Sequence, residues 1–446
     1  MSIEFAPNQA HSVQSQPQKT NAAINAERFL APPSFTQKLC QGLTFALFRN
    51  LRCGELTVIL PDGTQVKFTG PKSGPTALLK IKNRDFFKKV VVYGDIGFGE
   101  SYTDEDWETD NLFRLLEYFI TNVSHFPLVS GSLSKSGIFN LLAGMNRFMH
   151  YFKRNNLIGS RKNIEAHYDL SNNFFSLFLD PTMTYSSAYF SYTNESLESA
   201  QTKKYDRLCK KLRLKENDTI LEIGCGWGGF ALHAAKHYGC EVTGLTLSKE
   251  QLKFAQARVI AEGLEAKIKF LLLDYRHARG SFDKIVSIEM LEAVGDAYYE
   301  SFFTACNRLL KQNGLLALQV ITCPDSRYQQ FKKSVDWIQK HIFPGSLIPS
   351  LARLNQALER TGEIFLHSLD DLGHHYSETL HRWHIDFNLK EHEARSQGFD
   401  KKFIRKWNYY LQYCQAAFYT RNITVVQALY TRANNLLLNE PESIGR

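Results

Sequence analysis

The sequence predicts an α/β fold with a mixed sheet covered by helices on both faces, preceded by a small α+β domain. First, residues 219–223 form a short apolar run that ends in a cluster of glycines. Second, an Ala-rich helical pattern at 229–238 follows that cluster directly. Third, short apolar runs and helical patterns keep alternating beyond it, which is typical of a parallel sheet with helices on both sides. A strand, a glycine turn and a helix form the first unit of a Rossmann-like sheet.

The glycine cluster has the spacing of a loop that binds a nucleoside. Gly224, Gly226 and Gly228 form a GxGxG pattern, and Glu222 comes just before them. Glycine suits a tight turn that a bulky ligand approaches closely. This spacing, rather than GxGxxG, favours S-adenosylmethionine (SAM) over NAD. We therefore expect these four residues to contact SAM.

The alternation of strands and helices continues towards the end of the chain. We expect strands at 219–223, 241–245, 268–273, 283–288 and 314–321, with helices between them at 229–238, 248–262 and 297–310. Long helical patterns follow at 326–341, 349–361, 377–395 and 400–420. A last β-like run, 423–429, supplies the antiparallel strand that is common in SAM-dependent methyltransferases. The predicted fold class over residues 166–440 is therefore the Rossmann-like fold of class I SAM-dependent methyltransferases.

Further contacts with the cofactor are expected at the carboxyl ends of the next two strands, because open α/β sheets bind their ligands there. Thr246 and Gln251 follow the second strand, where the ribose hydroxyls would lie. Asp274 and Tyr275 follow the third, where they are placed for the adenine amine and ring face. Gln251 also has a purely structural interpretation, as the capping-box partner of Ser248.

The predicted small α+β domain covers residues 31–130. We expect in it a helix at 34–52, a hairpin at 56–68, short β-like runs at 77–81 and 90–93, and a helix at 111–123. Residues 1–30 are interpreted as a disordered tail, because they are mostly polar and lack the pattern of a signal peptide. Residues 131–165 are interpreted as a linker and a basic amphipathic helix.

Composition limits the class of protein. With 446 residues the chain can hold two domains that each have a core. No apolar run approaches the length needed to span a bilayer, so we do not expect an integral membrane protein. The eight cysteines include no CxxC pair, which favours a reducing cytoplasm over a disulfide framework or a zinc site. The histidines at 374, 375, 381 and 384 lack accompanying ligands in a recognisable pattern, so no metal site is expected.

The net charge of +8 suggests an anionic partner, either nucleic acid or a phospholipid surface. A merely soluble basic protein explains the charge as well. The aromatic and basic segment 138–152 fits a helix that lies on an anionic membrane, and equally a core helix with a basic edge. The basic run 203–215 could bind lipid phosphates or form a solvated helix face.

Several longer motifs make the function more specific. They are NIEAHYDLSNNFFSLFLDPTMTYSSAYF (163–190), LEIGCGWGG (221–229), TLSKEQ (246–251), EMLEAVG (289–295), KHIFPGSLIPS (340–350) and HHYSETLHRW (374–383). In this order and spacing, over roughly 160–430, the chain resembles the cyclopropane-fatty-acyl-phospholipid synthase family, which includes the mycolic acid cyclopropane synthases. The preceding domain resembles the longer bacterial and plant-type members, notably in FGESYTDEDW (98–107).

The resemblance implies a SAM-dependent reaction on the double bond of an unsaturated phospholipid acyl chain. The alkene attacks the sulfonium methyl and leaves a carbocation, a base removes a proton from the transferred methyl, and a cyclopropane ring closes. Such chemistry needs a dry cavity walled by aromatic rings, because water would trap the cation. The chain has 32 Phe and 20 Tyr, although most individual aromatic residues serve only in packing.

In related enzymes the base is a bicarbonate ion held by several residues. By motif, Glu292 and Tyr376 match that set in identity and Ile321 matches it in position. Ser187 stands where many members have Cys, and Gln319 stands where the bacterial enzymes have His; both can still hydrogen-bond an anion. Glu289 stands where many members have Gly. An extra carboxylate there could replace bicarbonate as base, or could be a solvated group.

The resemblance also suggests roles for five other residues. Tyr185 and Ser186 are expected to close over SAM, and His167 with Tyr168 to form part of a lid. Cys414 matches a cysteine once credited as a nucleophile, but a buried, unactivated thiol on a helix face is the better interpretation.

The leading hypothesis is therefore cyclopropane formation on phospholipids by a cytoplasmic enzyme at an anionic membrane surface, without a nucleic-acid partner. A C-methyltransferase that makes methyl- or methylene-branched acyl chains is the alternative within the enzyme class. A non-catalytic lipid-binding protein is disfavoured by the intact glycine loop and Glu292. A nucleic-acid methyltransferase is disfavoured because no Asn/Asp-Pro-Pro-aromatic motif is present. The small domain either presents lipid or mediates formation of a homodimer.

Overall fold

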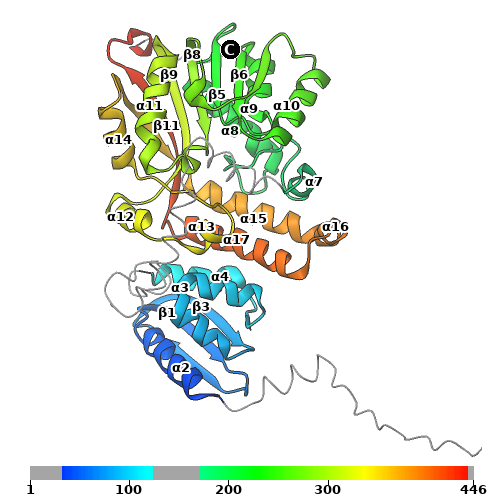
Figure 1. The fold of residues 1–446 in the computed structure, drawn as a ribbon, viewed down its shortest axis with the longest axis vertical. Coiled ribbons are helices and arrows are strands. Elements are labelled where there is room, and N and C mark those ends of the chain that lie inside the picture. Colours follow the sequence, from blue (N-terminus) through cyan, green and yellow to red (C-terminus); the bar gives the residue numbers. More distant parts are fainter. Residues whose placement is uncertain (1–32, 124–169, 440–446) are drawn as a thin grey trace, which may run out of the picture.

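The computed structural model describes residues 33–123 and 170–439, which form two separate sheets (Figure 1). The predicted tail, the predicted linker with its basic helix, and His167 and Tyr168 lie outside the described residues.

The smaller sheet belongs to the first part of the chain. Its strands, β1 (Cys53–Ile59), β2 (Gln65–Thr69), β3 (Lys72–Ile81) and β4 (Trp107–Glu108), are ordered β2-β1-β3-β4. Three helices accompany it: α2 (Phe35–Phe48), α3 (Asp85–Thr103) and α4 (Leu112–Thr121). β1 and β2 pair antiparallel around the turn at Asp62, which confirms the predicted hairpin. β1 and β3 pair parallel.

The strand predicted at 90–93 is wrong, because these residues lie within helix α3. Phe86, Phe87, Val90 and Val91 are all buried, and their spacing places them on one face of the helix. A short apolar run of this kind fits a strand and a buried helix equally well. The same helix bends at Gly94, whose φ of 60° and ψ of −131° are not helical.

The larger sheet has the order β10-β11-β9-β8-β5-β6-β7. Its strands are β5 (Thr219–Ile223), β6 (Glu241–Thr246), β7 (Ile268–Leu272), β8 (Phe282–Ile288), β9 (Leu310–Thr322), β10 (Ile364–Asp371) and β11 (Thr424–Arg432). All five strands expected between 219 and 321 are present. β11 pairs antiparallel with β9 and β10, as predicted. β10 was not predicted: it is an edge strand with partly exposed polar positions, so its apolar signal is weak.

Helices cover both faces of this sheet because successive residues of each strand point to opposite sides. Leu221 and Ile285 pack in the core with α11 (Tyr299–Leu309) and α14 (Leu351–Glu359). Ile220 and Val286 pack in the core with α8 (Leu197–Lys211), α9 (Gly229–Tyr238) and α10 (Lys249–Ala261). Figure 1 shows the two groups of helices on either side of the strands.

The long helix expected at 326–341 is two helices, α12 (Asp325–Lys333) and α13 (Trp337–His341). Asp336 separates them because its carboxylate accepts a hydrogen bond from the backbone N–H of Gln339, which begins a new helix with a capping box. The pattern at 377–395 likewise forms α15 (Gly373–Leu389) and α16 (Glu391–Ser396), and α17 (Lys401–Tyr419) follows.

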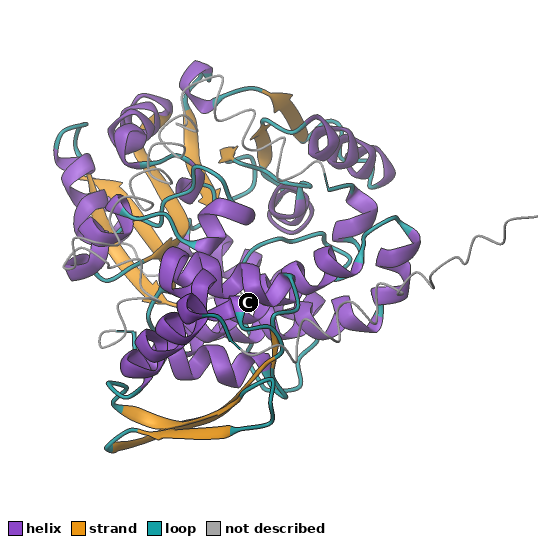
Figure 2. Cartoon of the chain, turned by 60° about the horizontal axis from the view of Figure 1, so that its bottom comes forward, coloured by secondary structure: helices purple, strands orange, loops and turns teal. Residues whose placement is uncertain are grey.

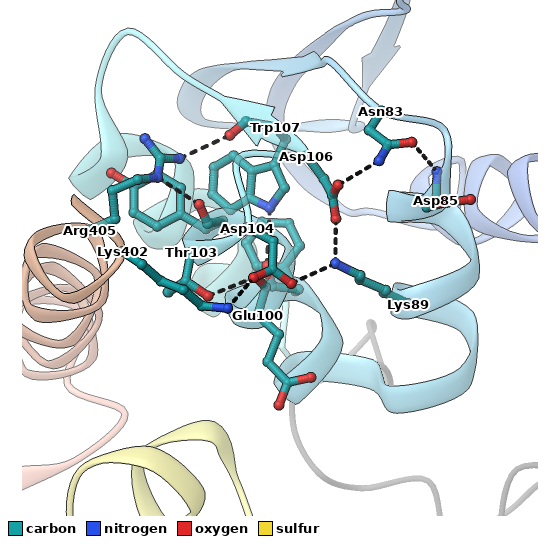
Figure 3. Close-up of polar contacts among 12 residues, drawn as sticks. Asn83, Asp85, Lys89, Glu100, Thr103, Asp104, Asp106, Trp107, Lys402 and Arg405 are labelled. Atoms are coloured by element: carbon teal, nitrogen blue, oxygen red, sulfur yellow. Dashed lines mark hydrogen bonds and ion pairs between the residues drawn. The ribbon is translucent and has the colours of Figure 1, made fainter. Parts of the chain in front are cut away.

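Helices α15 and α17 lie between the two sheets (Figure 1). Figure 2 shows helices between the strands of the two sheets. Arg405 of α17 donates hydrogen bonds to the carbonyls of Tyr102 (2.7 Å) and Trp107 (3.2 Å), and its guanidinium lies 3.9 Å from the centre of the Tyr102 ring. Lys402, one turn earlier, pairs with Asp104 at 2.6 Å (Figure 3). These contacts join the small sheet's helices to the larger part of the molecule.

Within the described residues no helix is both long and apolar enough to cross a membrane. All eight cysteines are described, and none forms a disulfide.

We predict that Arg405→Ala lowers the free energy of unfolding by about 1.5–3 kcal/mol, because it leaves two carbonyls without a charged donor. Lys402→Ala is the matched control: its ion pair is largely exposed to solvent, so the loss should stay below about 1 kcal/mol. Urea unfolding of both variants measures the difference. Equal losses would contradict the assignment of Arg405 as the main polar link.

Candidate active site

Two adjoining cavities lie at the carboxyl edge of the larger sheet. The smaller, of about 170 Å³, follows the ends of β5, β6 and β7. The larger, of about 240 Å³, lies among α12, α13, α15 and α17 and reaches α3 and α4. Tyr185, Glu289 and Ala293 line both cavities. A ligand in one cavity is therefore next to a ligand in the other.

The glycine loop forms one wall of the smaller cavity. Glu222, Gly224 and Gly226 line it. Gly224 and Gly226 have φ values of 86° and 52°, which suit glycine. Burial raises the pKa of the Glu222 carboxyl well above its ordinary range, and one of its oxygens, Oε2, has no hydrogen-bond partner in the described residues. That oxygen is free to accept a hydrogen bond from a ligand.

Gly228 differs from its neighbours, because it does not line the cavity. It has a φ of 84°, and a Cβ there would lie 2.8 Å from the Phe270 ring and 3.2 Å from Ala255. This glycine lets the start of α9 approach β7 and α10 closely. The expected contact with the cofactor therefore lacks support at Gly228.

The predicted ribose residues line the same cavity. The Thr246 hydroxyl donates a hydrogen bond to the side-chain oxygen of Gln251 at 2.9 Å, which leaves the amide nitrogen of Gln251 without a partner in the described residues. Ser248 caps α10 through the backbone N–H of Gln251. Both interpretations of Gln251 are thus compatible, since its backbone serves the cap and its side chain lines the cavity.

Asp274 and Tyr275 line the far side of the cavity. The Asp274 carboxylate accepts two hydrogen bonds from the Arg276 guanidinium, at 2.8 and 2.6 Å. Burial opposes its charge, but the bonds from Arg276 hold the pKa of Asp274 below its ordinary value. The carboxylate stays ionised and keeps accepting capacity for an adenine amine.

Helix α8 holds the segment that contains Tyr185 and Ser186. Tyr205 bonds Thr184 at 2.6 Å between hydroxyls, and Gln201 donates to the Ser186 carbonyl at 2.9 Å. Lys204 donates to the Ser186 hydroxyl at 2.8 Å. Tyr185 and Ser186 both line the smaller cavity.

Lys204 is an exception within the basic run 203–215, where Lys210 and Lys215 are exposed as a solvated face requires. It is fully buried and makes no ion pair with any described residue. Burial lowers its pKa to about 8, while the carboxylates of Glu289, Asp180 and Glu222 favour its charged form. A buried cation without a close partner is costly, so its position among three carboxylates indicates a functional role.

The Glu289 carboxylate is held by three donors from three parts of the chain. Oε1 accepts bonds from the Ser187 backbone N–H and the Gln319 side chain, each at 2.8 Å. Oε2 accepts the Tyr376 hydroxyl at 2.7 Å. Burial raises the pKa of Glu289, whereas these three bonds oppose the increase. Its φ of 49° is strained for a residue other than glycine.

Glu292 lies beside it on the turn that follows β8. Its Oε1 accepts the backbone N–H of Ile321 at 2.5 Å, and its Oε2 has no partner in the described residues. Burial, and then the nearby charge of Glu289, raise the pKa of Glu292 to about 8. The surroundings of the two carboxyl groups therefore differ: three donors favour the ionised form of Glu289, whereas burial and the charge of Glu289 favour the protonated form of Glu292 near neutral pH.

The remaining residues of the predicted catalytic set divide into two groups. Ile321, Tyr376 and Cys414 line the larger cavity. Ser187 and Gln319 are buried behind Glu289 and line neither cavity. Gln319 is oriented by Gln427, whose side-chain N–H bonds its oxygen at 3.0 Å. Of the two side chains expected to hydrogen-bond an anion, only that of Gln319 does so here, to the Glu289 carboxylate; the Ser187 hydroxyl donates to the carbonyl of Ala188 at 3.1 Å, and Ser187 reaches Glu289 through its backbone N–H.

Cys414 makes no hydrogen bond with a described residue, and burial raises the pKa of its thiol. No base activates it, so its surroundings favour a structural role over a nucleophilic one. In the described ranges, no group of three or more His, Cys, Asp or Glu side chains could hold a metal ion.

The residues present fit SAM but not bicarbonate. The smaller cavity offers hydrogen-bonding groups for a nucleoside at one end and the free oxygen of Glu222 at the other. The donors Ser187, Gln319 and Tyr376 are already used by Glu289, and a second anion beside that carboxylate would be repelled.

The two glycines give a test of this division. We predict that Gly228→Ala destabilises the protein by about 2–4 kcal/mol, from the left-handed backbone and the clash with Phe270. Gly226→Ala also has a left-handed backbone, which costs about 1–2 kcal/mol, but its Cβ meets no atom within 4 Å; it should therefore be less destabilised and bind SAM more weakly, because its methyl group occupies the cavity. Thermal unfolding and calorimetric titration with SAM separate the two effects. A reversal of the two phenotypes would contradict the assigned cavity.

Comparison with known proteins agrees with this geometry. The family model described as mycolic acid cyclopropane synthetase matches residues 155–428. The cyclopropane-fatty-acyl-phospholipid synthase of Escherichia coli K12 is 36% identical over 368 residues, covering 79% of this chain and 87% of that protein. A tuberculostearic acid methyltransferase of Mycobacterium tuberculosis is 34% identical over 381 residues, covering 83% and 86%. Among solved structures, a mycolic acid cyclopropane synthase complexed with SAH and CTAB is 32% identical, covers 61% of this chain and 98% of that one, and has a TM-score of 0.57.

These matches confirm the predicted fold class, a class I SAM-dependent methyltransferase fold. They also confirm the resemblance that the sequence motifs indicated. The chain belongs to the mycolic acid cyclopropane synthetase family.

Proposed function

We propose that the protein transfers a methylene group from SAM to the double bond of an unsaturated phospholipid acyl chain and forms a cyclopropane fatty acid. The observation that carries this proposal is the junction of the two cavities at Tyr185 and Glu289. SAM fits the smaller cavity, and an apolar chain fits the larger one. The names of the relatives, and the SAH bound to one of them, support the same pairing.

SAM, when bound, supplies an electrophilic methyl group. The electrons of the alkene form the new carbon–carbon bond as the bond to sulfur breaks, which leaves a carbocation on the acyl chain. Glu289 then accepts a proton from the transferred methyl, and the electrons of that C–H bond close the ring. The proton ends on the carboxyl group, so charge and atoms balance.

Glu289 suits the role of base, because its three donors favour the carboxylate while burial keeps it basic. Glu292, protonated near neutral pH, adds no second negative charge beside it. Such a separation of two neighbouring pKa values is how a pair of carboxyl groups takes different roles. On this proposal the Glu289 carboxylate takes the place of the bicarbonate of related enzymes.

The larger cavity can stabilise the cation and exclude water. Tyr185, Phe343, Tyr376, Tyr410 and Phe418 line it. The hydroxyls of Tyr185 and Tyr410 bond each other at 2.8 Å, and Tyr376 stacks on Phe418 with ring centres 4.4 Å apart. Aromatic faces attract a cation, and a dry wall offers no nucleophile to trap it.

We also propose a role for the small domain and an association with the membrane. Ile120 and Val123 contribute to the larger cavity, which supports a role of the small domain in presenting lipid. Formation of a homodimer remains the alternative role for its outer surface. We further propose that the enzyme is cytoplasmic and works as a peripheral protein on anionic membranes, for which the net charge of +8 is suitable.

The assay that tests the function uses purified protein, SAM and vesicles of monounsaturated phosphatidylglycerol. We expect high-field ring protons in the NMR spectrum of the recovered fatty acids. A methyl- or methylene-branched chain instead would favour the alternative, C-methyltransferase activity. Absence of any modified lipid would contradict both.

We predict that Glu289→Gln lowers turnover by about 10²–10⁴-fold, because an amide cannot accept the proton. Glu292→Gln is the matched control: it replaces a carboxyl that is already protonated near neutral pH, so turnover should fall by less than about tenfold. Both variants should keep their affinity for SAM. Equal losses in the two variants would contradict the division of roles.

Glu289→Gly provides a second test of the base. It relieves the positive φ and frees the donors Ser187, Gln319 and Tyr376. Added bicarbonate should restore activity to this variant and leave the wild-type rate unchanged. A wild-type enzyme that loses activity when bicarbonate is removed would contradict the proposed role of Glu289.

A further inference from the structure

The larger cavity contains a cation that the proposed reaction does not use. Arg327, in the first turn of α12, lines this cavity together with Phe331 and Asn422. Its guanidinium donates a hydrogen bond to the Asn422 side-chain oxygen at 2.6 Å and lies 5.4 Å from the centre of the Phe331 ring. Both neighbours are uncharged. Arg327 makes no ion pair with any residue in the described part of the chain.

The acidic residues closest in sequence are occupied elsewhere. Asp325 accepts the backbone N–H of Ala352 at 2.9 Å, and Asp336 caps α13 through Gln339 at 2.8 Å. Asp296 pairs with Lys332 and Arg353. Among the described residues, the charge of Arg327 therefore has no acidic partner and is left for a ligand. A planar guanidinium with several donors matches the oxygens of a phosphate group.

The position of Arg327 suits a phosphate at one end of a bound lipid. Thr424 pairs with Thr322, one residue beyond Ile321, and the Arg327–Asn422 pair lies outside the ends of these two strands. Ile321 is at the reacting end, where it contacts Glu292. A stretch of acyl chain therefore separates Arg327 from the reacting carbon atoms. Phe331 and Ile423 give this part of the cavity an apolar wall.

We propose that Arg327 binds the phosphodiester of the phospholipid substrate and so places the acyl double bond at the junction of the two cavities. This inference rests on the proposed function, because it names the group by which the same substrate is recognised. Lys333 lies exposed in the last turn of α12, on the same helix, and adds positive charge that suits an anionic lipid surface.

The test compares two lipids with the same monounsaturated chains, phosphatidylglycerol and diacylglycerol, in micelles of an uncharged detergent. For Arg327→Gln we expect a KM about tenfold higher for the phospholipid, unchanged kcat, and no change for diacylglycerol. Arg327→Lys should give an intermediate KM for the phospholipid, because lysine keeps the positive charge but lacks the planar guanidinium that donates two parallel hydrogen bonds. Arg360→Gln, an exposed arginine at the end of α14, is the matched control and should behave as wild type.

Equal effects of Arg327→Gln on both lipids would overturn the proposal and leave Arg327 as a structural partner of Asn422. Excess inorganic phosphate distinguishes the source of the phosphate group. It should inhibit the wild type only weakly, because the acyl chains supply most of the binding energy; strong competition would show a site for free phosphate and overturn the proposal.

A binding measurement keeps this test separate from the proposed function. Saturated phosphatidylglycerol has no double bond to react, yet it should bind the wild type more tightly than saturated diacylglycerol, and Arg327→Gln should abolish the difference. Calorimetry measures both affinities. A wild type that binds as predicted but modifies neither unsaturated lipid would contradict the proposed function alone, whereas equal affinities would contradict the role of Arg327.

Discussion

The carboxylate of Glu289, held by three hydrogen bonds, is the interaction on which the rest of the site depends. Its donors come from the segment before α8, from β9 and from α15. A buried carboxylate costs several kcal/mol unless it is hydrogen-bonded, and bonds to a charged group contribute about 1.5–3 kcal/mol each. Three such bonds can also offset the strain of the positive φ at this residue. They fix the carboxylate where the two cavities meet.

Other elements of the fold hold these donors in place. Helix α8 holds the segment of Ser187 through Gln201 and Lys204. The antiparallel strand β11 brings Gln427 beside Gln319 and so orients the amide. Lys204 adds a buried positive charge near Glu289 and Glu222, which favours ionised carboxylates on both sides of the junction. The edge of the sheet, α8 and α15 thus all help to hold the Glu289 carboxylate in place.

Much of the fold could be predicted from the sequence, because its strong signals are local. The glycine turn after β5 and the five apolar runs between 219 and 321 depend on short-range patterns. The helical residues 90–93 and the edge strand β10 could not be predicted, since a short or half-exposed apolar run does not determine its partner. Gly228 follows the loop pattern, but only the approach of Phe270 reveals its packing role.

The site was harder to predict where the contacts are distant in sequence. Motifs indicated Glu292 and Tyr376, and they marked Glu289 as a departure from the family pattern. Only the fold brings Ser187, Gln319 and Tyr376 around Glu289, across separations of 30 to 102 residues. Lys204 was hidden in a basic run, because charge patterns do not distinguish a buried lysine from solvated ones. Arg327 gave no signal in the sequence, because what distinguishes it is a spatial property: no acidic side chain of the described residues pairs with it.

The central claim is that a carboxylate of the protein removes a proton from the methyl group after its transfer. The most direct measurement uses SAM with a trideuterated methyl group and wild-type enzyme in buffer free of bicarbonate. We predict a cyclopropane product that retains two of the three deuterium atoms, formed at the normal rate. Retention of all three in a methyl-branched chain, or a reaction that stops without bicarbonate, would contradict it.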